Sequence, residues 1–96
     1  MFYFKRDWDD TRGDRYDFWG CSEWWIETNN EGYITRCIQK YRNGNILFYS
    51  EGHQEDKYGA LPEEALDVSE FKEFRITRFA FEKAISKFEP MNLKES

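Results

Sequence analysis

The sequence predicts an α+β domain: an antiparallel β-sheet of about four to five strands with a C-terminal helix packed on one face. Three observations carry this prediction. Strand-like runs fill the first half of the chain, turn signals separate them, and one apolar helical stripe follows near the end. Strands that precede a single helix, rather than alternating with helices, favour an antiparallel sheet with the helix across one face.

The first two strands are expected over residues 2–8 and 22–28. The first run is rich in aromatics, and the second alternates Trp24 and Ile26 with Trp25 and Glu27, which is the period-two pattern of a strand. Gly, Asp and alternating charge between the two runs predict a loop over residues 9–20.

The next two strands are expected over residues 33–42 and 45–50. Asn29-Asn30-Glu31-Gly32 predicts the turn before them, because Asn and Gly tolerate positive φ. Asn43-Gly44 predicts a two-residue type I′ hairpin between them. That turn pairs Tyr41 with Ile46 and Ile38 with Tyr49.

The pattern of the third run does not decide which of its faces is buried, because neither face is cleanly apolar. One face carries Ile34, Arg36, Ile38 and Lys40, and the other carries Tyr33, Thr35, Cys37 and Tyr41.

The remaining elements lie beyond Gly52. In the long connection over 52–70, Pro62 followed by two acids predicts a helical turn over 62–66. A short last strand is expected over 71–76. The closing helix has Thr77 as its N-cap and ends before Pro90. Its apolar stripe consists of Phe81, Ala84, Ile85 and Phe88.

Length predicts one domain over residues 1–90, with 91–96 as a flexible C-terminal tail. The chain has 14 Lys and Arg against 19 Asp and Glu, a net charge of −5. That balance argues against nucleic acid as a partner, because binding to phosphates needs clustered Lys and Arg side chains. No apolar run is long enough for a membrane span, and the start does not resemble a signal peptide. We therefore expect a cytoplasmic protein.

Residues typical of catalytic and metal centres are sparse. Cys21 and Cys37 are expected to be free thiols, and His53 is the single histidine. A nucleophilic centre would need His53 beside one of these thiols with an orienting acid. No phosphate-binding loop, His-Glu-x-x-His or Cys-x-x-Cys motif occurs. The sequence therefore predicts a non-enzymatic protein without cofactor or metal.

The charges are unevenly distributed along the chain. Residues 1–31 carry a net −4 and residues 50–73 a net −6, whereas residues 32–49 carry +3. If the two acidic segments meet in space, they form a negative face that attracts a basic protein partner; a merely solvated loop surface is the alternative. The expected contact set combines indoles and carboxylates: Trp8, Asp9, Asp10, Asp14, Asp17, Trp19, Glu55 and Asp56.

Several short motifs lie along most of the chain. They are Trp24-Trp25-Ile26-Glu27, Gly32-Tyr33-Ile34-Thr35-Arg36, Tyr41-Arg42-Asn43-Gly44-Asn45-Ile46-Leu47-Phe48-Tyr49, Asp56-Lys57-Tyr58-Gly59-Ala60-Leu61, Ile76-Thr77 and Phe81-Glu82. Through these motifs the chain resembles a family of small, stand-alone bacterial proteins known only as a domain of unknown function. The resemblance spans roughly residues 2–88, and its motifs are structural. It departs at Phe79 and Ala80, where acids are expected, and at Ile85, where Trp is expected.

The resemblance implies an immunity-type protein that binds a cognate toxin domain and neutralises it. Occlusion by acids and aromatics is the expected mechanism, with a basic toxin as the partner. A DNA-mimicking inhibitor is a variant of this hypothesis. The alternative function is a small-molecule-binding domain that uses exposed aromatics of the sheet. The sequence leaves the oligomeric state open.

Overall fold

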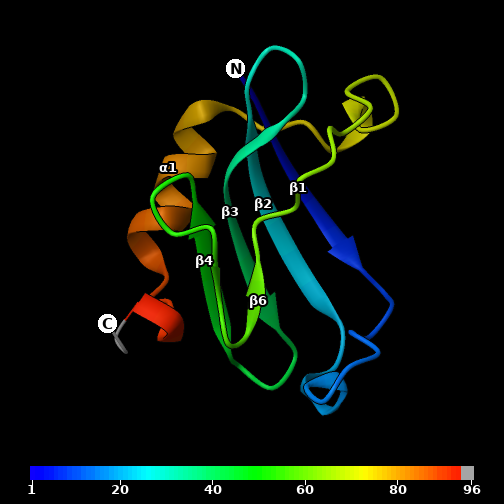
Figure 1. Cartoon of the computed structure of the whole chain (residues 1–96). Helices are drawn as coiled ribbons and strands as arrows, with labels where there is room; N and C mark the ends of the chain where they lie inside the picture. Colours follow the sequence, from blue (N-terminus) through cyan, green and yellow to red (C-terminus); the bar gives the residue numbers. More distant parts are fainter. Residues whose placement is uncertain (94–96) are drawn as a thin grey trace.

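The computed structural model describes residues 1–93, which are built on a four-stranded antiparallel sheet in the order β1-β2-β3-β4 (Figure 1). The strands lie within one residue of the predicted ranges at each end. They are β1 (Phe2–Trp8), β2 (Ser22–Thr28), β3 (Ile34–Tyr41) and β4 (Ile46–Ser50). The predicted α+β class is confirmed.

One row of side chains across the sheet forms the centre of the core. Phe4 pairs with Ile26, Ile26 with Cys37, and Cys37 with Tyr49. All four are at most 1% exposed. The face that carries this row also carries Tyr41, so the structure settles which side of β3 belongs to this core.

A bulge moves Ile34 to that face, contrary to the predicted grouping with Ile38. Thr28 pairs with Ile34 while its neighbour Glu27 pairs with Arg36, so Thr35 is an extra residue on β3. The extra residue reverses the alternation, because side chains in a strand change faces at every step. Ile34 therefore joins the core cluster of Cys37.

The hairpin turn differs from the predicted two-residue type I′ turn. Cys37 faces Tyr49 and Ile38 faces Phe48, one position away from the predicted register. The loop contains three residues, because the amide of Tyr41 donates to the carbonyl of Asn45. Of the two central residues only Gly44 has positive φ, and a type I′ turn needs it at both.

The opposite face of the sheet is covered by helix α1 (Arg78–Lys87), as predicted. Phe81 packs on Tyr3 with ring centroids 5.2 Å apart, and Phe88 packs on Trp25 at 4.9 Å. The Thr77 side chain accepts a hydrogen bond from the amide of Ala80, which confirms the N-cap.

An ion-pair network also joins this helix to the sheet. Arg36 lies 2.6 Å from carboxylate oxygens of both Glu27 on β2 and Glu82 on α1. These hydrogen bonds outweigh the burial of Glu27 and hold its pKa below the usual range.

The core face with Phe4 is covered by irregular segments rather than by a second helix (Figure 1). These segments contain η1 (Asp17–Trp19), the small hairpin of β5 (Glu55–Asp56) and β6 (Gly59–Ala60), and η2 (Lys72–Phe74). Residues 62–66 form no helical turn, which corrects that prediction. The strand expected over 71–76 is replaced by η2 and a single bridge between Phe4 and Arg75.

The described part of the predicted tail, residues 91–93, has regular structure. Residues Met91–Leu93 form the short helix η3, and Asn92 is buried. Its side chain bonds the backbone of Phe48 through both its oxygen and its nitrogen. Residues 94–96 lie outside the described part. No helix within 1–93 has the length and apolar character required to cross a bilayer.

Two glycines with positive φ offer a matched test of how the loops are attached. A Cβ on Gly32 would lie 2.5 Å from the carbonyl oxygen of Leu66, whereas one on Gly44 would meet nothing within 4 Å. We expect Gly44→Ala to lower the free energy of unfolding by about 1–2 kcal/mol through backbone strain alone. Gly32→Ala should cost more, because it also displaces the segment around Leu66. Urea titrations measure both losses, and equal losses would contradict this account.

Candidate functional site

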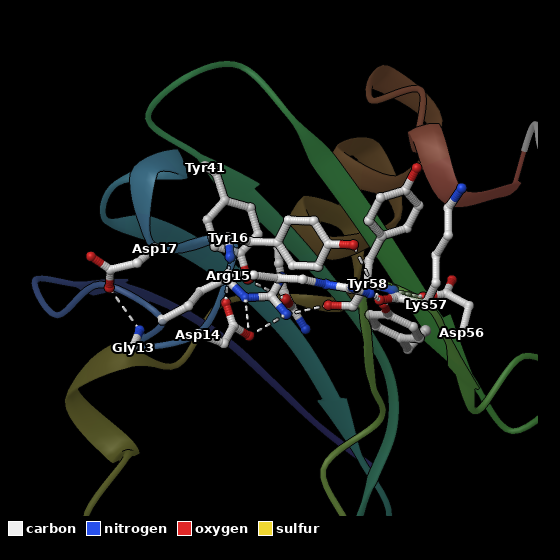
Figure 2. Close-up of polar contacts among 12 residues, drawn as sticks. Gly13, Asp14, Arg15, Tyr16, Asp17, Tyr41, Asp56, Lys57 and Tyr58 are labelled. Carbon is white, nitrogen blue, oxygen red and sulfur yellow. Dashed lines mark hydrogen bonds and ion pairs between the residues drawn. The ribbon is translucent and has the colours of Figure 1, made fainter.

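The two acidic segments lie side by side on the loop-covered face of the sheet (Figure 2). We call their combined outer face the loop surface, defined as residues 7–18 and 51–64. Arg15 and the hydroxyl of Tyr16 both donate to the carbonyl of Lys57, at 3.3 and 3.4 Å. Each segment contains five acidic residues, against two basic residues in the first and one in the second. The convergence expected from the charge pattern is therefore present.

Arg12 is the residue that joins the segments, and the sequence analysis missed it. Its guanidinium donates to the carbonyl of Tyr58 and forms an ion pair with Asp14 at 3.0 Å. It also lies 5.0–5.6 Å from the ring centroids of Tyr16, Trp19 and Tyr41. A weakly hydrated guanidinium is suited to such stacking.

Trp19 belongs to the core, which corrects its assignment to the contact face. It is 3% exposed and packs on Tyr16, Tyr41 and Tyr58 with centroids 4.7–5.8 Å apart. Its carbonyl accepts a hydrogen bond from the amide of Asn43. The role of this indole is to hold the first acidic segment on the sheet.

Asp56 is also structural rather than a free surface charge. Its carboxylate accepts hydrogen bonds from Tyr49, Asn92 and the amide of Tyr58, and lies 2.8 Å from His53. Burial raises the pKa of Asp56, but these hydrogen bonds outweigh it and hold the pKa at about 2. Asp56 thus connects β4, the β5–β6 hairpin and η3.

Asp14 and Asp17 have exposed carboxylates that also shape the first segment. Asp14 accepts hydrogen bonds from the amide of Tyr16 and from Arg12. Asp17 accepts from the amide of Gly13 at 2.7 Å. Hydrogen bonds from Thr11 and Gly13 lower the pKa of Asp17. Both acids therefore contribute negative charge while fixing the loop (Figure 2).

Trp8, Asp9, Asp10 and Glu55 are exposed on the loop surface. Trp8 is 37% exposed. Trp8 and Asp10 line one hollow together with Ala60, the residue that pairs with Glu55. A wider hollow of about 580 Å³ lies between the segments and is lined by both Asp14 and Glu55. Five of the eight expected contact residues line these two adjoining hollows: Trp8, Asp10, Asp14, Glu55 and Asp56.

The sequence analysis also missed Phe18. Its side chain is 77% exposed in η1, directly beside Asp17. Phe18 is exposed, whereas the adjacent Trp19 is buried. No periodic pattern in the 9–20 segment distinguishes the two residues. An exposed aromatic ring among carboxylates is typical of an interface anchor.

His53 and Cys37, two of the three groups considered for catalysis, have structural roles. The third, Cys21, is partly exposed, and its thiol donates to the carbonyl of Asp9. The His53 ring nitrogen pairs with Asp56, and its ring stacks on Tyr49. Cys37 is fully buried, and burial raises the pKa of its thiol to about 12, so it remains protonated at neutral pH. Within residues 1–93, no group of three or more His, Cys, Asp or Glu side chains is arranged to hold a metal ion.

Comparisons with protein-family models, with curated proteins and with solved structures gave no match for this chain. The resemblance to the small bacterial family therefore stays a prediction, and the loop surface is interpreted from its own geometry.

The hydrogen-bonded carboxylate of Asp56 predicts a specific acid sensitivity. Its pKa is about 2 in the folded chain and about 3.9 in an unfolded one. The folded state therefore binds fewer protons, and the stabilisation is present above pH 4 and lost as the pH falls through 2. Between pH 6 and 2, we expect the wild type to lose about 1–2 kcal/mol more stability than Asp56→Asn. Urea unfolding at a series of pH values measures this difference.

Asp10→Asn is the control for this experiment, because Asp10 is exposed on the same surface. It should keep the pH dependence of the wild type. Parallel stability curves for the wild type and Asp56→Asn would contradict the assigned role of Asp56.

Proposed function

We propose that this chain is a cytoplasmic, non-enzymatic protein-binding module of the immunity type, which neutralises a basic bacterial toxin domain by covering it with the loop surface. The observation that carries the proposal is the fixed apposition of two acidic segments more than 30 residues apart in the sequence. Carboxylates on one side of a domain attract a basic partner and raise its association rate.

The arrangement of the loop surface favours docking over chemistry. Arg12 and Trp19 fix the segments from below, while Asp9, Asp10 and Glu55 remain exposed above them. A preorganised surface loses little conformational entropy when a partner binds. Phe18 and the accessible part of Trp8 supply apolar contacts beside these charges, which is the combination found in interface hot spots.

The contact set proposed here differs from the one expected from the sequence by three residues. Trp19 and Asp56 are left out because their side chains are committed to the fold. Phe18 is added because it is exposed. The set is Trp8, Asp9, Asp10, Asp14, Asp17, Phe18 and Glu55.

Phe18 can be tested against a matched control, because Phe79 on α1 is also 77% exposed. The partner candidate is the product of the gene adjacent to this one. We expect co-expression to rescue cells from its toxicity and to yield a complex. Phe18→Ala should weaken the complex at least tenfold, as expected of a hot spot, whereas Phe79→Ala should leave affinity unchanged. Calorimetry on the purified pair measures both, and failure to rescue or to form a complex refutes the proposal.

The electrostatic part of the proposal predicts a salt-dependent association rate. Raising the ionic strength should slow association of the wild type steeply, because screening removes long-range attraction. Neutralising Asp9, Asp10 and Glu55 together should lower the rate about tenfold or more at low salt. The control neutralises Glu31, Glu70 and Glu73, outside the loop surface. Stopped-flow kinetics distinguish the two triple variants, and equal rates would count against docking through the loop surface.

A further inference from the structure

A second feature of the loop-covered face is a hollow of about 270 Å³ near the end of β1. Its walls include Trp8 and Trp24, its floor includes Gln39 and Tyr41, and Asp10 lies at one side. The volume is that of a small, fragment-sized pocket. Protein docking through the outer carboxylates does not require it.

The aromatic wall is held rigidly by its neighbours. Trp8 and Trp24 lie with their ring centroids 5.8 Å apart, and the indole nitrogen of Trp24 donates to the hydroxyl of Ser22 at 2.8 Å. The guanidinium of Arg6 stacks on the Trp8 ring at 4.6 Å. The two ring planes are inclined by 38°, so a flat ring can stack on one indole and pack against the other at an angle.

The floor contains a buried hydrogen-bond donor, the side-chain amide of Gln39, whose acceptor is weak. Gln39 is 4% exposed, and its Oε1 accepts the hydroxyl proton of Tyr41 at 2.7 Å. Its Nε2 meets the sulfur of Cys37 at 3.8 Å, and a thiol sulfur is a weak acceptor. A buried amide donor normally has a full partner, so Gln39 has donor capacity available to an oxygen acceptor.

Arg12, which lines the same hollow, has a second hydrogen-bond donor that lacks an acceptor among residues 1–93. Its Nη1 is buried and has no hydrogen-bond partner within the described residues. An acceptor such as a ring carbonyl would complement both side chains. The charge of Arg12 is already balanced by Asp14, so the donors match a neutral carbonyl better than an anion.

Asp10, which also lines the hollow, requires a hydrogen-bond donor on the ligand rather than an acceptor. Its carboxylate is an acceptor for an N–H group. With Asp9 next to it and a chain charge of −5, it also repels a phosphate. The complementary ligand is therefore flat, carries both a carbonyl and an N–H, and lacks a negative charge.

We propose that this hollow binds a neutral heteroaromatic lactam of the size of a single nucleobase, stacked on Trp8, packed against Trp24 and hydrogen-bonded to Gln39. This gives the small-molecule alternative a definite location and chemistry. The hollow shares Trp8 and Asp10 with the proposed toxin contact set. Ligand binding and toxin binding are measured separately, so either proposal can fail without the other.

Inosine is the probe, because its base has a ring carbonyl next to an N–H. Purine riboside, which lacks both groups, and inosine 5′-monophosphate, which adds negative charge, are the matched ligands. The chain has two glutamines, Gln39 in the floor and Gln54 on the exposed loop. We expect inosine to shift the side-chain amide signal of Gln39 saturably in ¹⁵N-resolved NMR spectra while Gln54 stays in place. Purine riboside should give no saturable shift, and the monophosphate should bind several-fold more weakly.

Protein variants test the aromatic wall. Trp8→Ala should weaken inosine binding at least about five-fold, the loss that accompanies removal of one stacking ring. Phe79→Ala, which removes an exposed ring on α1, should bind as the wild type does. The amide spectrum of each variant shows whether the fold is retained. An unmoved Gln39 signal, equal shifts at Gln54, or equal binding of purine riboside would overturn the proposal.

Discussion

A four-stranded sheet has two faces to bury, and the ten residues of α1 cover only one of them. The second face carries the row from Phe4 to Tyr49, which no strand or helix of regular length covers. Loop segments must therefore provide the covering layer, and they do so with aromatic side chains. Trp19, Tyr58 and Phe71 turn inward, each less than 10% exposed. The arrangement of the loop surface follows from this requirement.

A loop that serves as a covering layer has an inner and an outer side. Most aromatic rings of these segments pack on the inner side, except Phe18 and part of Trp8, and most acidic side chains point to solvent. Because both segments are rich in acids, the outer side becomes negative. Arg12 joins the two segments of this layer, because its guanidinium donates a hydrogen bond from one segment to the carbonyl of Tyr58 in the other. Structural and surface roles thus fall mostly on different residues, and Asp14 and Asp17 have both.

The sequence was informative where periodicity or capping chemistry acts locally. The four strands and the Thr77 cap were predicted within a residue, because alternation and side-chain capping depend on near neighbours. The bulge at Thr35 and the three-residue turn at Gly44 were missed, since both depend on how whole strands align. The expected helical turn over 62–66 is absent although Pro62 and its following acids favour one.

The candidate site was predictable in its charge but not in its individual residues. Clustering of acids in two segments is visible in the sequence, and the structure brings those segments together. Burial of Trp19 and exposure of Phe18 depend on the path of the backbone through η1. The pairing of Asp56 with Asn92 spans 36 positions, and nothing near either residue indicates it.

That long-range pairing makes the end of the chain part of the architecture of the opposite loop. Asn92 links β4 to the β5–β6 hairpin, because its amide nitrogen donates to both the carbonyl of Phe48 and the carboxylate of Asp56. Loss of the Asn92 side chain would thus loosen the β5–β6 hairpin, 36 positions upstream. An affinity tag is better placed ahead of Met1, because a displacement of η3 would pass through Asn92 to Asp56 in the loop surface.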